Sequence, residues 1–204
     1  MKPRVPPLRV AAVLALSAMP AMPGDTLVQI STIDALVKGI YDGSYSVGEL
    51  KKLGDFGIGT LDALDGEMLA LDGEFFQITA TGVVRKIGDE EETPFSAVTF
   101  FKSDKSVSLG NVESLAALQL RLDAETRSAN LFHAIRISGD FTMMNLRSVP
   151  RQEPPYQPLT EVVKQQANFK LANVRGTLVG FRCPPFVKGI NVPGYHLHFI
   201  SDDR

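Results

Sequence analysis

The order of hydrophobic and polar residues predicts short strands and helices in alternation. Residues 27–32 predict a strand, and the helical spacing of apolar residues over 33–40 predicts a short helix after it. The segment 46–49, SVGE, matches a capping box and predicts the start of a second short helix. Two apolar runs flank Asp72-Gly73, a dipeptide that favours a tight β-hairpin.

The second half of the chain continues this mixture. The segment 130–149 predicts two strands that turn at Gly139-Asp140, and Thr160 is the expected cap of a helix over 160–169. Further strands are expected over 80–86, 95–101, 174–185 and 194–201, and a helix over 111–122 with Leu115, Leu118 and Leu122 on one face. Because hairpins outnumber βαβ units, we predict an α/β fold of the α+β type, with mixed, largely antiparallel sheets and a few short helices.

A proline-rich segment divides the chain. PRQEPPYQPL, residues 150–159, carries prolines at four of its ten positions, which favours a rigid, extended connection. We therefore expect an α/β half over 25–149. Residues 150–204 are expected to supply the crossover and the start of a second half that interlocks with the first.

Residues 1–24 differ in character from the rest. Three basic residues precede an apolar run over 10–19, which is too short to span a bilayer as a helix. The pattern is typical of a signal peptide, and a disordered leader on a cytoplasmic protein is the alternative. The first interpretation predicts cleavage between Ala18 and Gly24, a secreted or periplasmic location, and no membrane attachment afterwards.

Composition narrows the class of partner. The 21 basic and 23 acidic residues give a net charge of −2, which argues against a nucleic-acid partner and suits a small, dissociable substrate. The single cysteine, Cys183, excludes an intrachain disulfide framework and a cysteine-rich zinc site. Any tightly held metal must therefore be bound by histidines and carboxylates. A homodimer is compatible with the sequence, which does not fix the oligomeric state.

Two of the three histidines, His196 and His198, lie one residue apart near the end of the chain. On a strand, residues i and i+2 point to the same side, roughly 6.6 Å apart. Both imidazoles can therefore reach one metal ion at about 2.0–2.1 Å. Tyr195, Leu197 and Phe199 would then face the core. The alternative is a pair of solvated or hydrogen-bonded histidines on a strand.

Other polar positions are candidates on weaker grounds. Glu67 precedes an apolar strand, where it is either a buried carboxylate that needs a partner or a solvated charge beside a turn. Arg147 either binds a carboxylate through both guanidinium nitrogens or caps a strand end. His133 lies within a predicted strand between Phe132 and Ala134, which favours a packed or edge histidine over a metal ligand.

Three long segments, taken together, resemble the α-acetolactate decarboxylase family. They are DFGIGTLDALDGEMLALDGEFFQ, LRSVPRQEPPYQPL and RGTLVGFRCPPFVKGINVPGYHLHFISDDR, within a similarity that runs from about Leu27 to Arg204. The resemblance implies a zinc enzyme that converts 2-hydroxy-2-methyl-3-oxobutanoate (2-acetolactate) to acetoin and carbon dioxide. Zinc would serve as a Lewis acid at the keto oxygen of the substrate.

The resemblance also implies roles for single residues. The family's paired metal-binding histidines fall on His196 and His198, and its catalytic arginine in R-S-V-P falls on Arg147. Its active-site glutamate in L-D-G-E falls on Glu67, and the substrate-proximal threonine of G-x-G-T falls on Thr60. Arg147 would hold the substrate carboxylate, and Glu67 would orient the substrate or relay a proton.

The sequence departs from the family pattern at its end. The family continues past ISDDR with a Gly-Gly-His segment that supplies a third zinc ligand, and later with a second active-site glutamate; neither occurs here. We therefore expect a truncated chain with weak zinc binding and little decarboxylase activity. One alternative is a non-catalytic remnant of the family with an incomplete metal site. Another is a generic histidine-dependent metal binder with a cupin-like barrel, which explains only the H-x-H pair.

Overall fold

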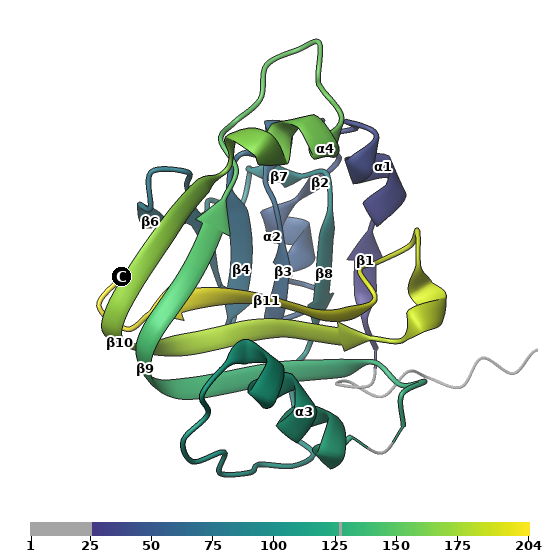
Figure 1. The fold of residues 1–204 in the computed structure, drawn as a ribbon. Coiled ribbons are helices and arrows are strands. Elements are labelled where there is room, and N and C mark those ends of the chain that lie inside the picture. The colour runs from purple at the N-terminus through teal and green to yellow at the C-terminus, as the bar shows by residue number, and fades with distance from the viewer. Residues whose placement is uncertain (1–25, 127) are drawn as a thin grey trace, which may run out of the picture.

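The computed structural model describes residues 26–126 and 128–204 (Figure 1). The leader predicted over 1–24 lies outside the described residues. Within them, every strand ladder is antiparallel and the helices are short, which confirms the predicted fold class. No helix in this part of the chain is long and apolar enough to cross a membrane.

The larger sheet has six strands in the order β1-β8-β3-β4-β5-β6. Asp72 and Gly73 have φ angles of 53° and 80° between β4 and β5, so they form the predicted hairpin turn. The strands are β1 (Val28–Ile30), β3 (Phe56–Gly59), β4 (Glu67–Leu71), β5 (Glu74–Ile78), β6 (Val84–Lys86) and β8 (Ser96–Thr99). A separate pair joins β2 (Tyr45–Ser46) to β7 (Glu92–Thr93).

The smaller sheet has three strands in the order β11-β10-β9. They are β9 (His133–Ser148), β10 (Ala167–Cys183) and β11 (Gly194–Ser201). The two strands predicted over 130–149 are therefore wrong, because β10 gives β9 a partner along its whole length and no turn is needed at Gly139. The long ribbon instead bends (Figure 1), and Asn173, opposite Thr142, has a φ of 52°. The smaller sheet is therefore built from β9, which precedes the proline-rich segment, and from β10 and β11, which follow it.

The helices begin close to the predicted positions. Thr32 and Ser46 cap the first two helices through their side-chain oxygens, and Ser46 does so as the capping-box pattern predicts. Thr160 is not a cap: it lies inside α4, whose first residue follows Pro158. The helices are α1 (Ile33–Val37), α2 (Val47–Leu50), α3 (Leu115–Glu125) and α4 (Leu159–Val162), with 3₁₀ turns η1 (Asp62–Leu64), η2 (Val163–Gln165) and η3 (Pro185–Val187).

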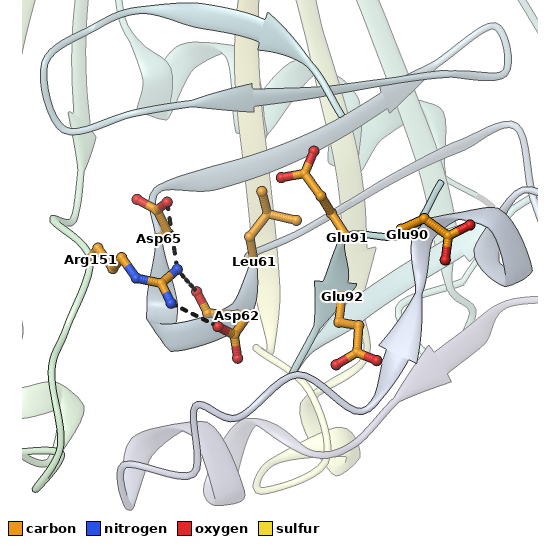
Figure 2. A pocket seen from close by; sticks show the side chains of 7 residues that line it. All are labelled: Leu61, Asp62, Asp65, Glu90, Glu91, Glu92 and Arg151. Carbon is orange, nitrogen blue, oxygen red and sulfur yellow. Dashed lines mark hydrogen bonds and ion pairs between the residues drawn. The ribbon is translucent and has the colours of Figure 1, made fainter. Parts of the chain in front are cut away.

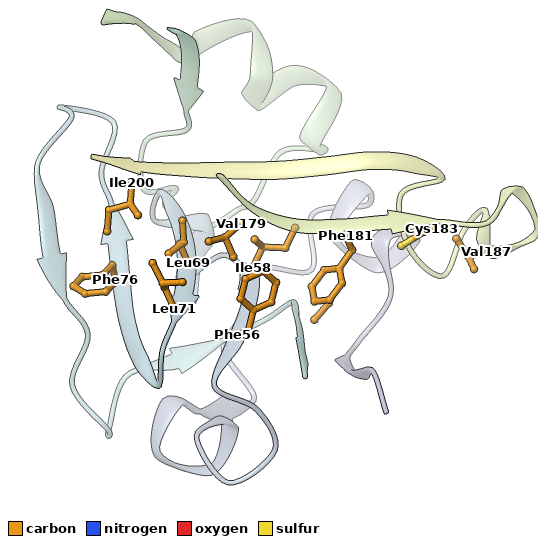
Figure 3. Close-up of a cluster of buried hydrophobic side chains, with 11 residues drawn as sticks. Phe56, Ile58, Leu69, Leu71, Phe76, Val179, Phe181, Cys183, Val187 and Ile200 are labelled. Atoms are coloured by element: carbon orange, nitrogen blue, oxygen red, sulfur yellow. The ribbon is translucent and has the colours of Figure 1, made fainter. Parts of the chain in front are cut away.

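The main core lies between the two sheets (Figure 3). Residues of β3, β4, β5 and β8 meet residues of β10 and β11 there, and Figure 3 shows the smaller sheet lying across the larger one. Burial of these apolar side chains is the main force that holds the sheets together. The cluster comprises Phe56, Ile58, Leu69, Leu71, Phe76, Ala97, Val179, Phe181, Cys183, Val187 and Ile200.

Helices cover the outer faces of both sheets. Val47 and Leu50 of α2 pack on the larger sheet, and Leu118 of α3 packs on the smaller one. Leu122 also packs there, but Leu115 is 60% exposed, so the predicted three-leucine face of α3 is wrong at its first position. Leu115 is the first residue of the helix and lies beyond the part that contacts the sheet.

Candidate functional site

The histidine pair lies on β11 and faces the larger sheet. Their Nε2 atoms are 3.3 Å apart, and the next residue on that face, Ile200, belongs to the core between the sheets. Leu197 and Phe199 pack on the opposite side, under α3. The alternation predicted for this strand is therefore confirmed for these positions, because successive side chains point to opposite faces.

A backbone contact fixes the tautomer of His198. Its Nδ1 lies 2.9 Å from the carbonyl oxygen of Met68 on β4. A carbonyl only accepts, so Nδ1 carries the proton and Nε2 keeps a lone pair. In the metal-free protein, the 3.3 Å contact between the rings then requires His196 Nε2 to donate. The buried Nδ1 of His196 has no hydrogen-bond partner among the described residues.

Glu67 begins β4 and faces the histidines across the space between the sheets. Its Oε2 lies 3.4 Å from His198 Nε2, although 131 positions separate the two residues in the sequence. Alternation along β4 places Glu67 on the same face as Leu69, in the core between the sheets. Burial raises the pKa of Glu67 to about 7, and the positive charge of Arg147 opposes part of that rise.

Burial acts in the opposite direction on the histidines. It lowers the pKa of His196 to about 3, helped by His198 and Arg147. It lowers the pKa of His198 to about 4, against the hydrogen bond to Met68 and with a further contribution from Arg147. Both imidazoles are therefore neutral at neutral pH, the state that binds metals.

Arg147 is the second-last residue of β9, and its side chain is exposed. It forms no ion pair within residues 26–126 and 128–204. Its charge nevertheless affects the pKa values of Glu67, His196 and His198, so the guanidinium lies close enough for its charge to act on all three. The structure therefore brings four of the sequence-predicted residues into one neighbourhood; their catalytic roles stay predictions.

Thr60 and His133 occupy different surroundings. Thr60 is buried, and its hydroxyl donates to the carbonyl of Gly66 at 2.7 Å, so it holds the residue that precedes Glu67. His133 is the first residue of β9, at the other end of that strand from Arg147, and pairs in register with Arg182.

The paired histidines fit one zinc ion in distance and chemistry. Two ligands at about 2.0–2.1 Å from a tetrahedral zinc ion lie about 3.3–3.4 Å apart, which matches the separation of the two Nε2 atoms. The 3.4 Å distance from His198 to the Glu67 carboxylate is of the same size. Within the described residues, however, no group of three or more His, Cys, Asp or Glu side chains forms a ready-made metal site.

A cavity of about 310 Å³ lies elsewhere on the surface and was not anticipated from the sequence (Figure 2). Arg151 contacts Asp62 at 2.9 Å and Asp65 at 3.9 Å on one side of it. Glu90, Glu91 and Glu92 line the other side. The acidic run GDEEET was the available signal, but nothing in it indicates Arg151, which is about 60 positions away. None of the predicted site residues lines this cavity.

Comparison with known proteins is consistent across sequence and structure. The family model for alpha-acetolactate decarboxylase matches residues 27–204. The alpha-acetolactate decarboxylase of Methanosarcina mazei is 52% identical over 180 residues, 88% of this chain and 62% of that protein. The enzyme of that name from Brevibacillus brevis is 40% identical over 98% of this chain and 70% of its own length.

A solved structure shows the same fold. The crystal structure of alpha-acetolactate decarboxylase from Bacillus subtilis strain 168 superposes with a TM-score of 0.85 at 42% identity, covering 87% of this chain and 76% of that one. The match thus spans 62% to 76% of the length of these relatives. On this evidence, the chain belongs to the alpha-acetolactate decarboxylase family.

Proposed function

We propose that the protein decarboxylates 2-acetolactate to acetoin and carbon dioxide at the site formed by His196, His198, Glu67 and Arg147. One observation carries the proposal. Two neutral imidazoles lie 3.3 Å apart between the sheets, and a carboxylate of raised pKa lies 3.4 Å from one of them. The charge of an exposed arginine acts on all three groups. Family membership supports the same reaction.

The histidines would hold zinc through their Nε2 atoms. The hydrogen bond from His198 Nδ1 to Met68 keeps that ring oriented with its lone pair toward the site. Zinc bound there would supply Lewis acidity to the hydroxyl and keto oxygens of the substrate. The keto group lies β to the carboxylate, so a polarised carbonyl can accept the electron pair that remains when carbon dioxide leaves.

Arg147 would bind the substrate carboxylate. A guanidinium presents two parallel N–H groups to a carboxylate and remains charged at any pH the protein meets. Its side chain is exposed and has no carboxylate partner among the described residues, so it is available for a ligand. Once carbon dioxide has left, the same positive charge stabilises the negative charge that remains on the substrate.

Glu67 would move the proton. With a pKa of about 7, both its protonated and its ionised form are populated at neutral pH. Such a group donates and accepts protons with similar ease, as a general acid–base catalyst must. Protonation of the carbon that has lost carbon dioxide completes acetoin, and delivery from one face would set the configuration of the product.

The test compares substitutions of two arginines, Arg147 and Arg151, in zinc-loaded protein assayed with 2-acetolactate. Arg147→Lys keeps the charge but loses the paired N–H groups, and we expect acetoin formation to fall about 100-fold. Arg151→Lys makes the same change at the acidic cavity and should leave the rate unchanged. Equal rates for both variants and the unaltered protein would contradict the proposed role of Arg147. An unaltered protein that forms no acetoin above the uncatalysed rate would contradict the function.

A second candidate function is a folded protein that binds zinc weakly and does not turn over acetolactate. It is favoured by one observation: within the described residues, no group of three or more His, Cys, Asp or Glu side chains is arranged to hold a metal ion. The same assay separates the candidates when bound zinc is measured on each sample. Zinc bound at the histidines without acetoin formation would support this second candidate.

A further inference from the structure

A buried hydroxyl joins the strand of Arg147 to the strand pair of Glu67. Ser148, the last residue of β9, is fully buried, and its Oγ donates to the carbonyl oxygen of Ile78 at 2.9 Å. Ile78 is the last residue of β5 and the register partner of Glu67. The hydrogen bond therefore joins the residue after Arg147 to the residue that lies directly opposite Glu67 on the neighbouring strand.

A backbone bond supports the same junction. The N–H of Gly66, which precedes Glu67, donates to the carbonyl oxygen of Val149 at 3.1 Å. Ser148 and Val149 thus attach the end of β9 to both strands of the hairpin at the end where Glu67 lies. Of these two bonds, only that of Ser148 depends on a side chain.

Two other buried polar groups near Glu67, Thr60 and Gln77, act within the larger sheet or its loops. Thr60 donates to the carbonyl of Gly66, and Gln77 of β5 donates to the carbonyl of Asp65 at 2.7 Å. They hold the turn before β4 but do not reach β9. Among these side chains, the hydroxyl of Ser148 is the one that joins β9 to the larger sheet beside the site.

Strand geometry explains why this contact would matter for Arg147. Neighbouring side chains on a strand project to opposite faces, so the buried Ser148 anchors the backbone next to Arg147 while the Arg147 side chain stays exposed. Without the anchor, the strand end is free to shift, and Arg147 shifts with it. A displacement of about 1 Å of a group that positions substrate can cost up to about 100-fold in rate.

We infer that Ser148 is a positioning residue that sets the separation between Arg147 and Glu67. This inference rests on the proposed function. Ser148 does not touch the substrate in this account; it acts through the backbone of β9. Its loss should therefore reduce turnover by more than its effect on folding stability explains.

The test uses the full chain, loaded with zinc, and three variants. Ser148→Ala removes the hydroxyl, and Ser148→Cys keeps a group of similar size that is a weaker donor. Ser138→Ala is the matched control, because Ser138 lies on the same strand and its hydroxyl bonds Thr177 at 2.9 Å, remote from Arg147. For each protein, kcat and KM for acetoin formation are measured together with the unfolding midpoint.

We expect kcat of Ser148→Ala to fall about tenfold, with Ser148→Cys intermediate, and kcat of Ser138→Ala to stay unchanged. Unchanged kcat and KM in Ser148→Ala, with active unaltered protein, would overturn this inference alone. An equal fall in kcat for Ser138→Ala would also overturn it, since the effect would then be structural. No turnover by the unaltered protein would overturn the proposed function and the inference together.

Discussion

The histidine site and the acidic cavity contrast in how the protein treats its charges. At the cavity, Arg151 pairs with Asp62, and Glu91, which lines the cavity, pairs with the nearby Arg85 at 2.5 Å. The pKa of Asp62 is lowered, first by the N–H of Gly43, and the pKa of Glu91 is lowered by its bond to Arg85. At the histidine site, burial dominates, and the pKa of Glu67 rises to about 7.

The difference separates charges that stabilise the fold from groups that remain available for chemistry. Five carboxylates and a cavity of about 310 Å³ mark the acidic region, but its best-placed groups are already satisfied by partners within the chain. At the histidine site, the imidazole nitrogens and the Glu67 carboxylate contact one another, and among the described residues none of them pairs with an arginine or a lysine. A raised pKa caused by burial is the better indicator of function here.

Loss of a histidine should give the largest effect. His198→Ala removes one of the two imidazole ligands, and we expect zinc affinity to fall by more than about 100-fold, because even loss of an outer-shell partner costs 10–100-fold. Glu91→Gln, in the acidic cavity, should change affinity by less than about twofold. Competition with a chromophoric chelator measures both. Comparable losses in the two variants would show that zinc binds by surface charge instead.

Substitution of Glu67 should stabilise the metal-free protein. In the folded state the pKa of Glu67 is about 7, above its usual value of 4.5. Between pH 4.5 and 7, the folded protein therefore holds a proton that the unfolded protein has lost. Stability is therefore highest below that window and falls as pH rises from about 4.5 to 7. Glu67→Gln should remove this dependence and raise the free energy of unfolding at pH 8 by about 1–3 kcal/mol.

Urea unfolding of the metal-free protein and of this variant, at pH 5 and at pH 8, provides the measurement. The variant and the unaltered protein should be similar at pH 5 and diverge at pH 8. A variant that is less stable at pH 8 would show that the Glu67 carboxylate is satisfied in the fold.

Asp62 should show the opposite sign and the smallest effect. Its pKa is lowered in the folded state, so its contribution to stability is present above the usual value of 3.8 and is lost as pH falls through the lowered pKa. Its side chain is 42% exposed, so solvent screens the pair with Arg151. Asp62→Asn should therefore cost about 0.5–1 kcal/mol at pH 7, by thermal or urea unfolding. A stabilising effect would remove the contrast with Glu67.

Features set by local sequence were predictable. Asp72-Gly73 adopts the positive φ angles that a two-residue hairpin requires, and the spacing of His196 and His198 by itself places both on one face of β11. The strand length of β9 was not predictable in this way, because pairing with β10 determines it. The exposure of Leu115 likewise depends on where the smaller sheet ends, not on the periodicity of α3.

The assembly of the site was predictable only in part. Nothing in the residues alone relates Glu67 to His198; only the family resemblance related them, and tertiary packing brings them to 3.4 Å. The bond from Ser148 to Ile78 joins positions 70 residues apart and has no sequence signal. Arg151 and the acidic residues around it are brought together in the same way.

The dependence of turnover on zinc is tested by measuring acetoin formation and bound zinc on one sample as zinc is removed and returned. We expect no turnover in the metal-free protein and a rate that rises in proportion to the zinc bound. In His198→Ala, zinc added at the same concentrations should restore neither binding nor turnover. Acetoin formation that continues at full rate after zinc is removed would contradict the account.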